Sequence, residues 1–238
     1  MADSDTVWGL RRRPGRLPAG IRRFEADLSV PASLRDLPSA IDYVVYAVSP
    51  GGYDDAHYRA AYVEGPRRLI EALDRQGHAP RRVFFVSSTT VYEQSDGSWV
   101  DEDSPTEPEN FSGLRVCEGE RIVREGPWPA TVLRLGGIYG PRRTRLIDRV
   151  RAGRAVYADG PARYSNRIHR DDCAGALHHL MHLAEPQDLY LGVDSDPADE
   201  ADRLARRAGP LPGPVGILPR GSARPDRSFR GPRRHRPG

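Results

Sequence analysis

The sequence contains no lysine, so all 36 residues in its lysine-plus-arginine total are arginine. A GC-rich genome is the simplest explanation for this bias. The consequence for chemistry is strict, because an arginine guanidinium does not give up its proton in a protein, whereas a lysine amine can. The composition therefore excludes every mechanism that uses a lysine amine.

Cysteine is scarce, with only Cys117 and Cys173 in 238 residues. Two cysteines without paired spacing indicate reduced thiols rather than a disulfide framework or a zinc site. Long apolar runs are also lacking, since none approaches the roughly 20 residues that a membrane span needs. The first residues contain no apolar segment of the kind found in secretory signals. We therefore expect a cytoplasmic protein without membrane contact.

Charge is divided unevenly along the chain. The net charge is +3, but residues 209–238 alone hold seven arginines against one aspartate, which leaves the remainder at about −3. The same 30 residues contain seven prolines and six glycines, a composition that favours disorder over packed structure. Because Phe229 is its one aromatic residue, we do not expect this basic tail to bind nucleic acid.

Apolar runs alternate with segments of helical periodicity. The runs have little strict polar alternation, which is typical of parallel strands buried on both faces. The pattern predicts an α/β protein with a Rossmann-like, doubly wound parallel sheet. We expect strands at 6–10, 21–27, 41–48, 82–88, 130–137 and 188–193, and helices at 30–37, 54–77, 111–126, 144–153 and 170–185.

Small and hydroxyl residues gather where the predicted strands end. Ligands of such sheets bind beyond the carboxyl ends of the strands, so these exits are the candidate site. The exits are Arg11–Arg13, Asp27–Leu28, Ala47–Ser49, Ser87–Thr90 and Gly136–Gly140. Small residues there allow a nucleotide to approach the backbone closely, although tight turns alone also use them.

These segments, in this order, resemble the extended short-chain dehydrogenase/reductase family, also called the NAD-dependent epimerase/dehydratase family. The resemblance spans residues 6 to 195, which leaves 196–208 as a helical extension before the tail. Two segments, "NFSGLRVCEGE" and "NRIHRDD", are similar to an atypical branch of the family. The matching segments are "EADL" (25–28), "VVYAVSP" (44–50), "FFVSSTTVY" (84–92), "DEDSPTEP" (101–108), "LRLGGIYGPRR" (133–143) and "NRIHRDDCAGAL" (166–177).

The resemblance implies a cofactor, NAD or NADP, and a set of residues that contact it. Asp27 and Leu28 would lie against the adenine, and Ser88 matches the catalytic Ser/Thr that hydrogen-bonds the substrate oxygen. Further cofactor contacts are expected at Ala47, Val48, Ser87 and Gly137. Arg11 and Arg12 could grip a 2′-phosphate, which favours NADP, but a solvated basic loop explains them equally well.

The family's catalytic Tyr-x-x-x-Lys pair is replaced in this sequence. One alignment puts Ser112 at the tyrosine position and Val116 at the lysine position, and a shift of one residue gives Phe111 and Arg115. Neither alignment offers a phenol, and serine is a poor acid or base without an activating partner. The candidate catalytic residues are therefore Ser88, Ser112 and Arg115.

The family's opening strand and Gly-x-x-Gly-x-x-Gly turn have no counterpart in this sequence. That turn normally brings backbone N–H groups to the pyrophosphate. We expect the sheet to begin at the family's second strand, so that the strands at 6–10 and 41–48 lack the partner between them. The sequence then corresponds to an N-terminally incomplete copy.

The acidic and histidine residues near position 170 are interpreted as structural. In the family that the chain resembles, the equivalent Asp caps the following helix, so a cap is preferred here to a metal site formed by His169, Asp171 and Asp172. His178 and His182 share a helix face, but no third ligand is evident. No metal site is predicted.

Three functions stay open at this point. The first is an NAD(P)-dependent oxidoreductase or epimerase/dehydratase that acts on a small, possibly sugar-like substrate. The second is a catalytically inactive dinucleotide-binding or sensor module, and the third is a non-functional truncated copy. The sequence does not predict an oligomeric state.

Overall fold

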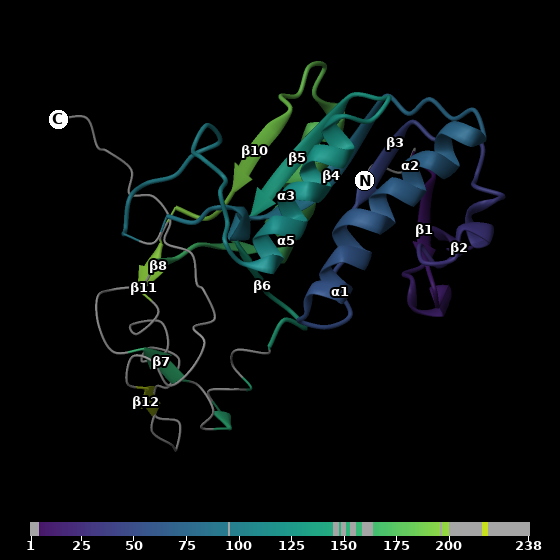
Figure 1. Cartoon of the computed structure of the whole chain (residues 1–238). Coiled ribbons are helices and arrows are strands. Elements are labelled where there is room, and N and C mark those ends of the chain that lie inside the picture. The colour runs from purple at the N-terminus through teal and green to yellow at the C-terminus, as the bar shows by residue number, and fades with distance from the viewer. Residues whose placement is uncertain are drawn as a thin grey trace. The chain divides into compact units, whose positions relative to one another are not determined.

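The computed structural model describes residues 5–94, 96–144, 148, 151–152, 156–158, 164–195, 197–199 and 216–218. Strands and helices alternate along the chain in an α/β arrangement (Figure 1). The chain divides into two compact units. The first holds the described residues of 1–87, 110–133 and 178–189, and the second holds the others.

The largest sheet in the described part of the chain has four strands, in the order β10-β5-β4-β3. Its strands are β3 (Tyr43–Tyr46), β4 (Arg82–Ser88), β5 (Ala130–Leu135) and β10 (Leu189–Gly192). β3 and β4 run parallel, with Val44 opposite Val83. All six residues of β5 are buried, as expected for a strand covered on both faces. The predicted fold class is confirmed.

A second sheet pairs β1 (Val7–Arg11) with β2 (Ile21–Glu25) in parallel, with Val7 opposite Ile21. Among the described residues, β1 pairs only with β2, and β3 is the last strand of the larger sheet. Tyr43 and Val45 of β3 are 37% and 42% exposed, and Trp8 of β1 is 42% exposed. The strands expected at 6–10 and 41–48 therefore have no strand between them in the described part of the chain.

The helix predicted at 54–77 is interrupted. It consists of α1 (Asp55–Arg59), a π-helical turn (Ala60–Glu64) and α2 (Gly65–Arg75). The cause is Pro66, which lacks an N–H and whose ring would clash with the carbonyl of Tyr62 in a regular α-helix. The buried hydroxyl of Tyr46 donates to the carbonyl of Ala61 at 2.5 Å, which satisfies a backbone group inside the π turn.

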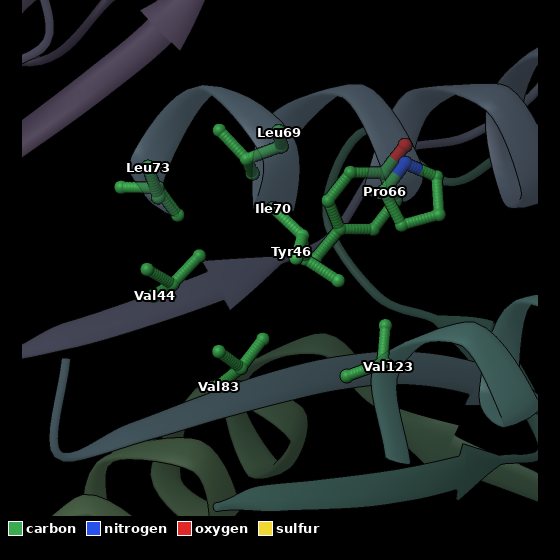
Figure 2. Close-up of a pocket in the computed structure, with 8 residues that line it drawn as sticks. All are labelled: Val44, Tyr46, Pro66, Leu69, Ile70, Leu73, Val83 and Val123. Atoms are coloured by element: carbon green, nitrogen blue, oxygen red, sulfur yellow. The ribbon is translucent and has the colours of Figure 1, made fainter. Parts of the chain in front are cut away.

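The core of the first unit lies between α2, α3 (Phe111–Arg124) and the sheet. The ring of Tyr46 stacks on Phe85 with centroids 5.7 Å apart. Beside them is a recess under α2 (Figure 2). It is lined by Val44, Tyr46, Pro66, Leu69, Ile70, Leu73, Val83 and Val123. Because these side chains are apolar apart from the bonded Tyr46 hydroxyl, the recess belongs to the core rather than to a polar ligand site.

Several short elements differ from the prediction. The segment predicted as a strand at 130–137 ends at Leu135, and β6 (Gly137–Tyr139) pairs in parallel with β9 (Arg167–His169). The helix predicted at 30–37 is a 3-10 turn, Pro31–Leu34. Two more 3-10 turns are Pro14–Arg16 and Thr89–Val91, and α5 spans Arg170–His182.

The later residues add two small strand pairs. β8 (Tyr164–Ser165) pairs with β11 (Ala198–Asp199), and β7 (Val156–Ala158) pairs with β12 (Gly216–Leu218). These strands include Ala198–Asp199 of the predicted extension and Gly216–Leu218 of the predicted tail. The rest of both segments, and most of the helix predicted at 144–153, lie outside the described residues. No helix in the described part is long and apolar enough to cross a membrane.

The packing of α3 can be tested by a substitution at Gly119. A Cβ at this position would overlap the carbonyl oxygen of Tyr62 and lie 2.8 Å from Phe85. We expect Gly119→Ala to lower the free energy of unfolding by about 2 kcal/mol, because the clash with backbone exceeds the gain in helix propensity. Gly175→Ala in α5 is the control. Apart from its chain neighbours and the backbone of its own helix, nothing lies within 4 Å of a Cβ at this position, so the substitution should stabilise by about 0.5–1 kcal/mol. Urea unfolding measures both, and equal effects would contradict the packing argument.

Candidate functional site

A tight turn after β2 fixes Asp27. Its Oδ1 accepts hydrogen bonds from the backbone N–H of Ser29 at 2.8 Å and from the Ser29 hydroxyl at 2.7 Å. These bonds, aided by the charge of Arg12, lower the pKa of the Asp27 carboxyl. The backbone N–H of Asp27 donates to Ser33 Oγ at 2.9 Å. The β2 exit thus presents an ionised carboxylate close to an arginine.

The neighbouring exit residues differ in how much of them a ligand can reach. Arg11 and Arg12 are exposed at the end of β1, and Ala47 is exposed after β3. Val48 and Leu28 are half-buried, and both pack against the core. The β1 and β3 exits therefore offer accessible side chains, while Val48 and Leu28 anchor their loops.

Ser87 and Ser88 at the end of β4 have different environments. Ser87 is buried and donates its hydroxyl proton to Glu120 Oε1 of α3 at 2.5 Å, so its side chain is engaged inside the first unit. Ser88 is half-buried, and its oxygen accepts from the backbone N–H of Thr90 at 3.2 Å. Its hydroxyl proton has no acceptor within the described part of the chain. Ser88 is therefore able to donate to a ligand.

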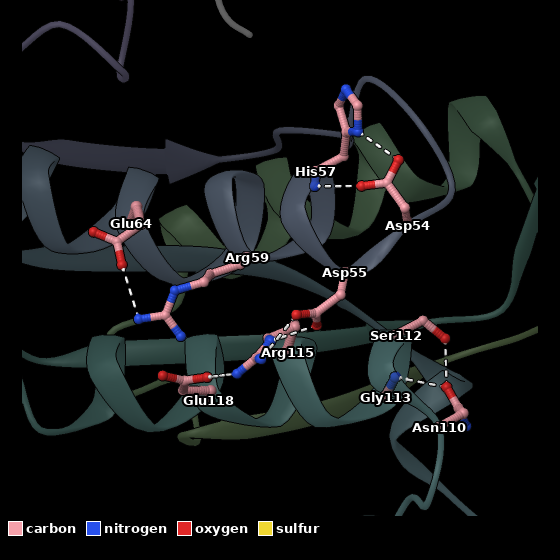
Figure 3. Close-up of polar contacts among 10 residues, drawn as sticks. All are labelled: Asp54, Asp55, His57, Arg59, Glu64, Asn110, Ser112, Gly113, Arg115 and Glu118. Carbon is pink, nitrogen blue, oxygen red and sulfur yellow. Dashed lines mark hydrogen bonds and ion pairs between the residues drawn. The ribbon is translucent and has the colours of Figure 1, made fainter.

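The start of α3 is a closed capping arrangement (Figure 3). Asn110 is the N-cap, and its side chain accepts a hydrogen bond from the backbone N–H of Gly113 at 2.9 Å. Ser112 is 4% exposed and donates its hydroxyl proton to the same Asn110 side chain. Both the burial and the hydrogen bond withdraw Ser112 from contact with a ligand.

Arg115 joins α3 to α1. Its guanidinium donates to both carboxylate oxygens of Asp55 at 2.8 and 3.0 Å and to Glu118 at 2.9 Å (Figure 3). These contacts raise the pKa of Arg115, and the bond from Arg115 lowers the pKa of Asp55. With two carboxylates as partners, Arg115 acts as an ion-paired clamp between helices.

Gly137 lies in the second unit, at the start of β6. Its backbone N–H donates to the carbonyl of Asn166 at 2.9 Å, and a Cβ would overlap the guanidinium of Arg167. Nearby in sequence, Arg134 donates to the hydroxyl of Tyr92 at 3.0 Å and lies over its ring. Tyr92 in turn donates to the carbonyl of Asp101 at 2.7 Å, which indicates a structural role.

The structure groups some predicted residues and not others. Ser112 and Arg115 share the first two turns of α3, and Ser87 is joined to the same helix through Glu120. Tyr53 was not predicted as a site residue from the sequence. It is 68% exposed, and its ring lies 5.3 Å from that of Phe111. Its position, five residues after the expected cofactor segment at Ala47–Val48, was the available signal.

Metal-binding clusters are not found among the described residues, where no group of three or more suitable side chains occurs. His178 and His182 of α5 have ring centroids 4.4 Å apart, and His182 Nδ1 lies 2.7 Å from the His178 carbonyl. His182 Nδ1 is therefore engaged by the helix backbone. Asp171 and Asp172 lie in the first turn of α5.

Comparison with known proteins gives one family. The model of the NAD-dependent epimerase/dehydratase family matches residues 1–192. A solved structure assigned to that family, from Methylobacillus flagellatus, is 33% identical with a TM-score of 0.67, covering 90% of this chain and 79% of that one. A search of curated proteins found no match.

Two further solved structures contain NAD. A short-chain dehydrogenase/reductase superfamily protein from Agrobacterium tumefaciens with bound NAD is 25% identical, with a TM-score of 0.69 and coverage of 90% and 78%. MoeE5 in complex with UDP-glucose and NAD is also 25% identical, with a TM-score of 0.72 and coverage of 96% and 82%. The chain thus spans more than two thirds of each of these proteins.

The Ser87–Glu120 bond is expected to stabilise the first unit. Ser87→Ala removes a donor from a buried carboxyl group and should lower the free energy of unfolding by about 1–3 kcal/mol. Combined with Glu120→Gln in a double-mutant cycle, it should reveal a coupling of about 1 kcal/mol or more in urea unfolding. Ser88→Ala serves as the control and should change stability by less than about 0.5 kcal/mol. Additive effects of Ser87→Ala and Glu120→Gln would contradict the bond.

Proposed function

Since the chain belongs to the NAD-dependent epimerase/dehydratase family, we propose that it binds a nicotinamide dinucleotide and acts on a small, sugar-like substrate. The observation that carries this proposal is the set of strand exits. An ionised carboxylate ends β2, exposed arginines end β1, and a hydroxyl with a free proton ends β4. Such groups suit the ribose, phosphate and carbonyl oxygens of these ligands.

The adenosine end of the dinucleotide fits the residues after β1 and β2. Asp27 is held in one position by Ser29, and its low pKa keeps it an acceptor for the N–H and O–H donors of a nucleoside. Arg11 and Arg12 supply exposed donors for a phosphate, which supports NADP as the preferred form. The sequence offers no Gly-x-x-Gly-x-x-Gly turn for the pyrophosphate.

The nicotinamide end is assigned to residues after β4 and β5. In the proposal Ser88 donates a hydrogen bond to the substrate oxygen, and the backbone at Gly137 lies near the nicotinamide. A bound dinucleotide supplies or accepts the hydride in reactions of this class. The protein's own part is to orient the substrate and hold its oxygen.

A second candidate function is binding without turnover, as in a sensor. It is favoured by the state of α3, where Ser112 is buried against Asn110 and Arg115 is ion-paired with Asp55 and Glu118. Neither side chain is available as an acid or base in that arrangement. The two candidates predict the same cofactor and differ in turnover.

Titration of the protein with NADPH and NADH, followed by nucleotide fluorescence, tests the shared part of both candidates. We expect a dissociation constant below a millimolar, a binding free energy beyond about −4 kcal/mol. Incubation with a panel of sugar nucleotides and carbonyl compounds then tests turnover. In an enzyme, Ser88→Ala should lower turnover by about tenfold or more, from one lost hydrogen bond to the reacting oxygen, and leave dinucleotide binding unchanged. Binding with no turnover on the whole panel would favour the sensor.

The preference for NADP is tested at the β1 exit. Replacing Arg11 and Arg12 together by alanine should weaken NADPH binding by about tenfold or more, because charge-assisted hydrogen bonds to the 2′-phosphate are lost. NADH binding should change little. Arg75→Ala, an exposed arginine at the end of α2, is the matched control. An equal loss of NADPH and NADH affinity in the double variant would show that the arginines do not read the 2′-phosphate.

A further inference from the structure

Tyr53 is a strongly exposed aromatic residue, at 68%. We propose that Tyr53 supplies the phenol of this site, donating a hydrogen bond and a proton to an oxygen of the sugar-like substrate. It takes the place of the phenol that the start of α3 lacks. The inference rests on the proposed function and assigns one further residue to it.

The first argument is position. The Tyr53 ring lies 5.3 Å from that of Phe111, the first residue of α3 and one of the two positions that align with the family's tyrosine. It also lies 5.6 Å from the ring of Tyr58 in an edge-on contact. Edge contacts of this kind hold an aromatic ring in a defined orientation. A phenol is therefore present at the start of α3, carried there by the segment that follows β3.

The second argument is that this segment is fixed on both sides of Tyr53. On the C-terminal side, Asp54 caps α1 and contacts His57, while Asp55 accepts two hydrogen bonds from Arg115 (Figure 3). On the N-terminal side, the backbone at Gly52 lies so near His57 that a Cβ would be 2.9 Å from its Nδ1. The backbone that carries Tyr53 is thus placed by contacts of its neighbours on both sides, which favours a defined position of the side chain.

This arrangement gives Arg115 a role other than the catalytic one expected from the sequence. Its bidentate pair with Asp55 holds α1 against α3, two residues beyond Tyr53. Arg115 is thus a positioning residue for the phenol. In one of the two alignments Arg115 stands at the position of the family's lysine. In the proposal it acts through Asp55, by helping to position Tyr53.

The third argument is availability. The Tyr53 hydroxyl has no hydrogen-bond partner among the described residues, unlike that of Tyr46, which donates to Ala61. Tyr46 is buried and Tyr62 is half-buried, whereas Tyr53 is open to water. In proton donation, the phenol O–H bond breaks and an O–H bond forms on the substrate oxygen. Water then returns a proton to the exposed phenolate.

Ligand protection tests the contact without requiring turnover. The protein is nitrated at tyrosine with tetranitromethane, alone and with NADH and UDP-glucose, and each tyrosine is quantified by peptide mass spectrometry. With ligands at ten times their dissociation constants, nitration of Tyr53 should slow by about tenfold. Tyr43 on the exposed edge of β3 is the internal control, 37% exposed, and should react at the same rate in both samples.

Substitutions test whether the Tyr53 hydroxyl donates the proton. Tyr53→Phe keeps the ring and removes the hydroxyl, so it should lower turnover by about a hundredfold or more and leave NADH binding unchanged. Tyr43→Phe should leave both unchanged. Asp55→Asn weakens the clamp and should lower turnover less than Tyr53→Phe does, and the loss should come with faster nitration of Tyr53.

The outcomes separate the two proposals. Unchanged nitration of Tyr53 in a protein that binds both ligands overturns the inference alone. Full turnover by Tyr53→Phe also overturns it. A loss of turnover seen in His57→Gln and not in Tyr53→Phe overturns it too, because the proton donor would then be the Asp54–His57 pair. Absence of any NADH, NADPH or UDP-glucose binding by the unaltered protein rejects the proposed function, and the inference with it.

Discussion

The close approach of α3 to the π-helical turn is the constraint on which the first unit depends. Gly119 of α3 lies against the carbonyl of Tyr62, where any side chain would overlap the backbone. Pro66 prevents a regular helix at this turn and so shapes the surface that α3 meets. Without this contact α3 could not lie near enough to the sheet for Glu120 to reach Ser87.

The same packing decides what the first turns of α3 can do. Because α3 lies along α1, Arg115 meets Asp55 and Phe111 meets the ring of Tyr53. Two of the three residues that the sequence assigned to catalysis are engaged there, Ser112 with the N-cap Asn110 and Arg115 in ion pairs. The exposed phenol of Tyr53 is a product of the contact between the two helices, which no local sequence pattern encodes.

Much of the fold could be read from the sequence because burial leaves a clear periodic signal. Residues such as Phe84, Phe85 and Val132 form uninterrupted apolar runs, and the strands at 82–88 and 130–135 follow them closely. The interruption at Pro66 was missed because the apolar spacing continues through it. The short strands β6 and β9 were missed because three residues are too few to show a period.

The candidate site was predictable in place and not in detail. Strand order alone places Asp27, Ala47 and Ser88 at strand exits, and the structure has them there. Whether a side chain is engaged depends on partners far along the chain. Ser87 meets Glu120 across 33 residues and Arg115 meets Asp55 across 60. Such pairings are properties of packing and leave no signal in local sequence.

The uncovered edge of β3 has a consequence for how the protein behaves in solution. A strand edge presents a row of N–H and C=O groups that can accept another strand, and here it also carries the half-exposed side chains of Tyr43 and Val45. No lysine is available along this edge to discourage pairing by charge. In the described part of the chain, this edge of β3 is thus one that a strand of another molecule could pair with.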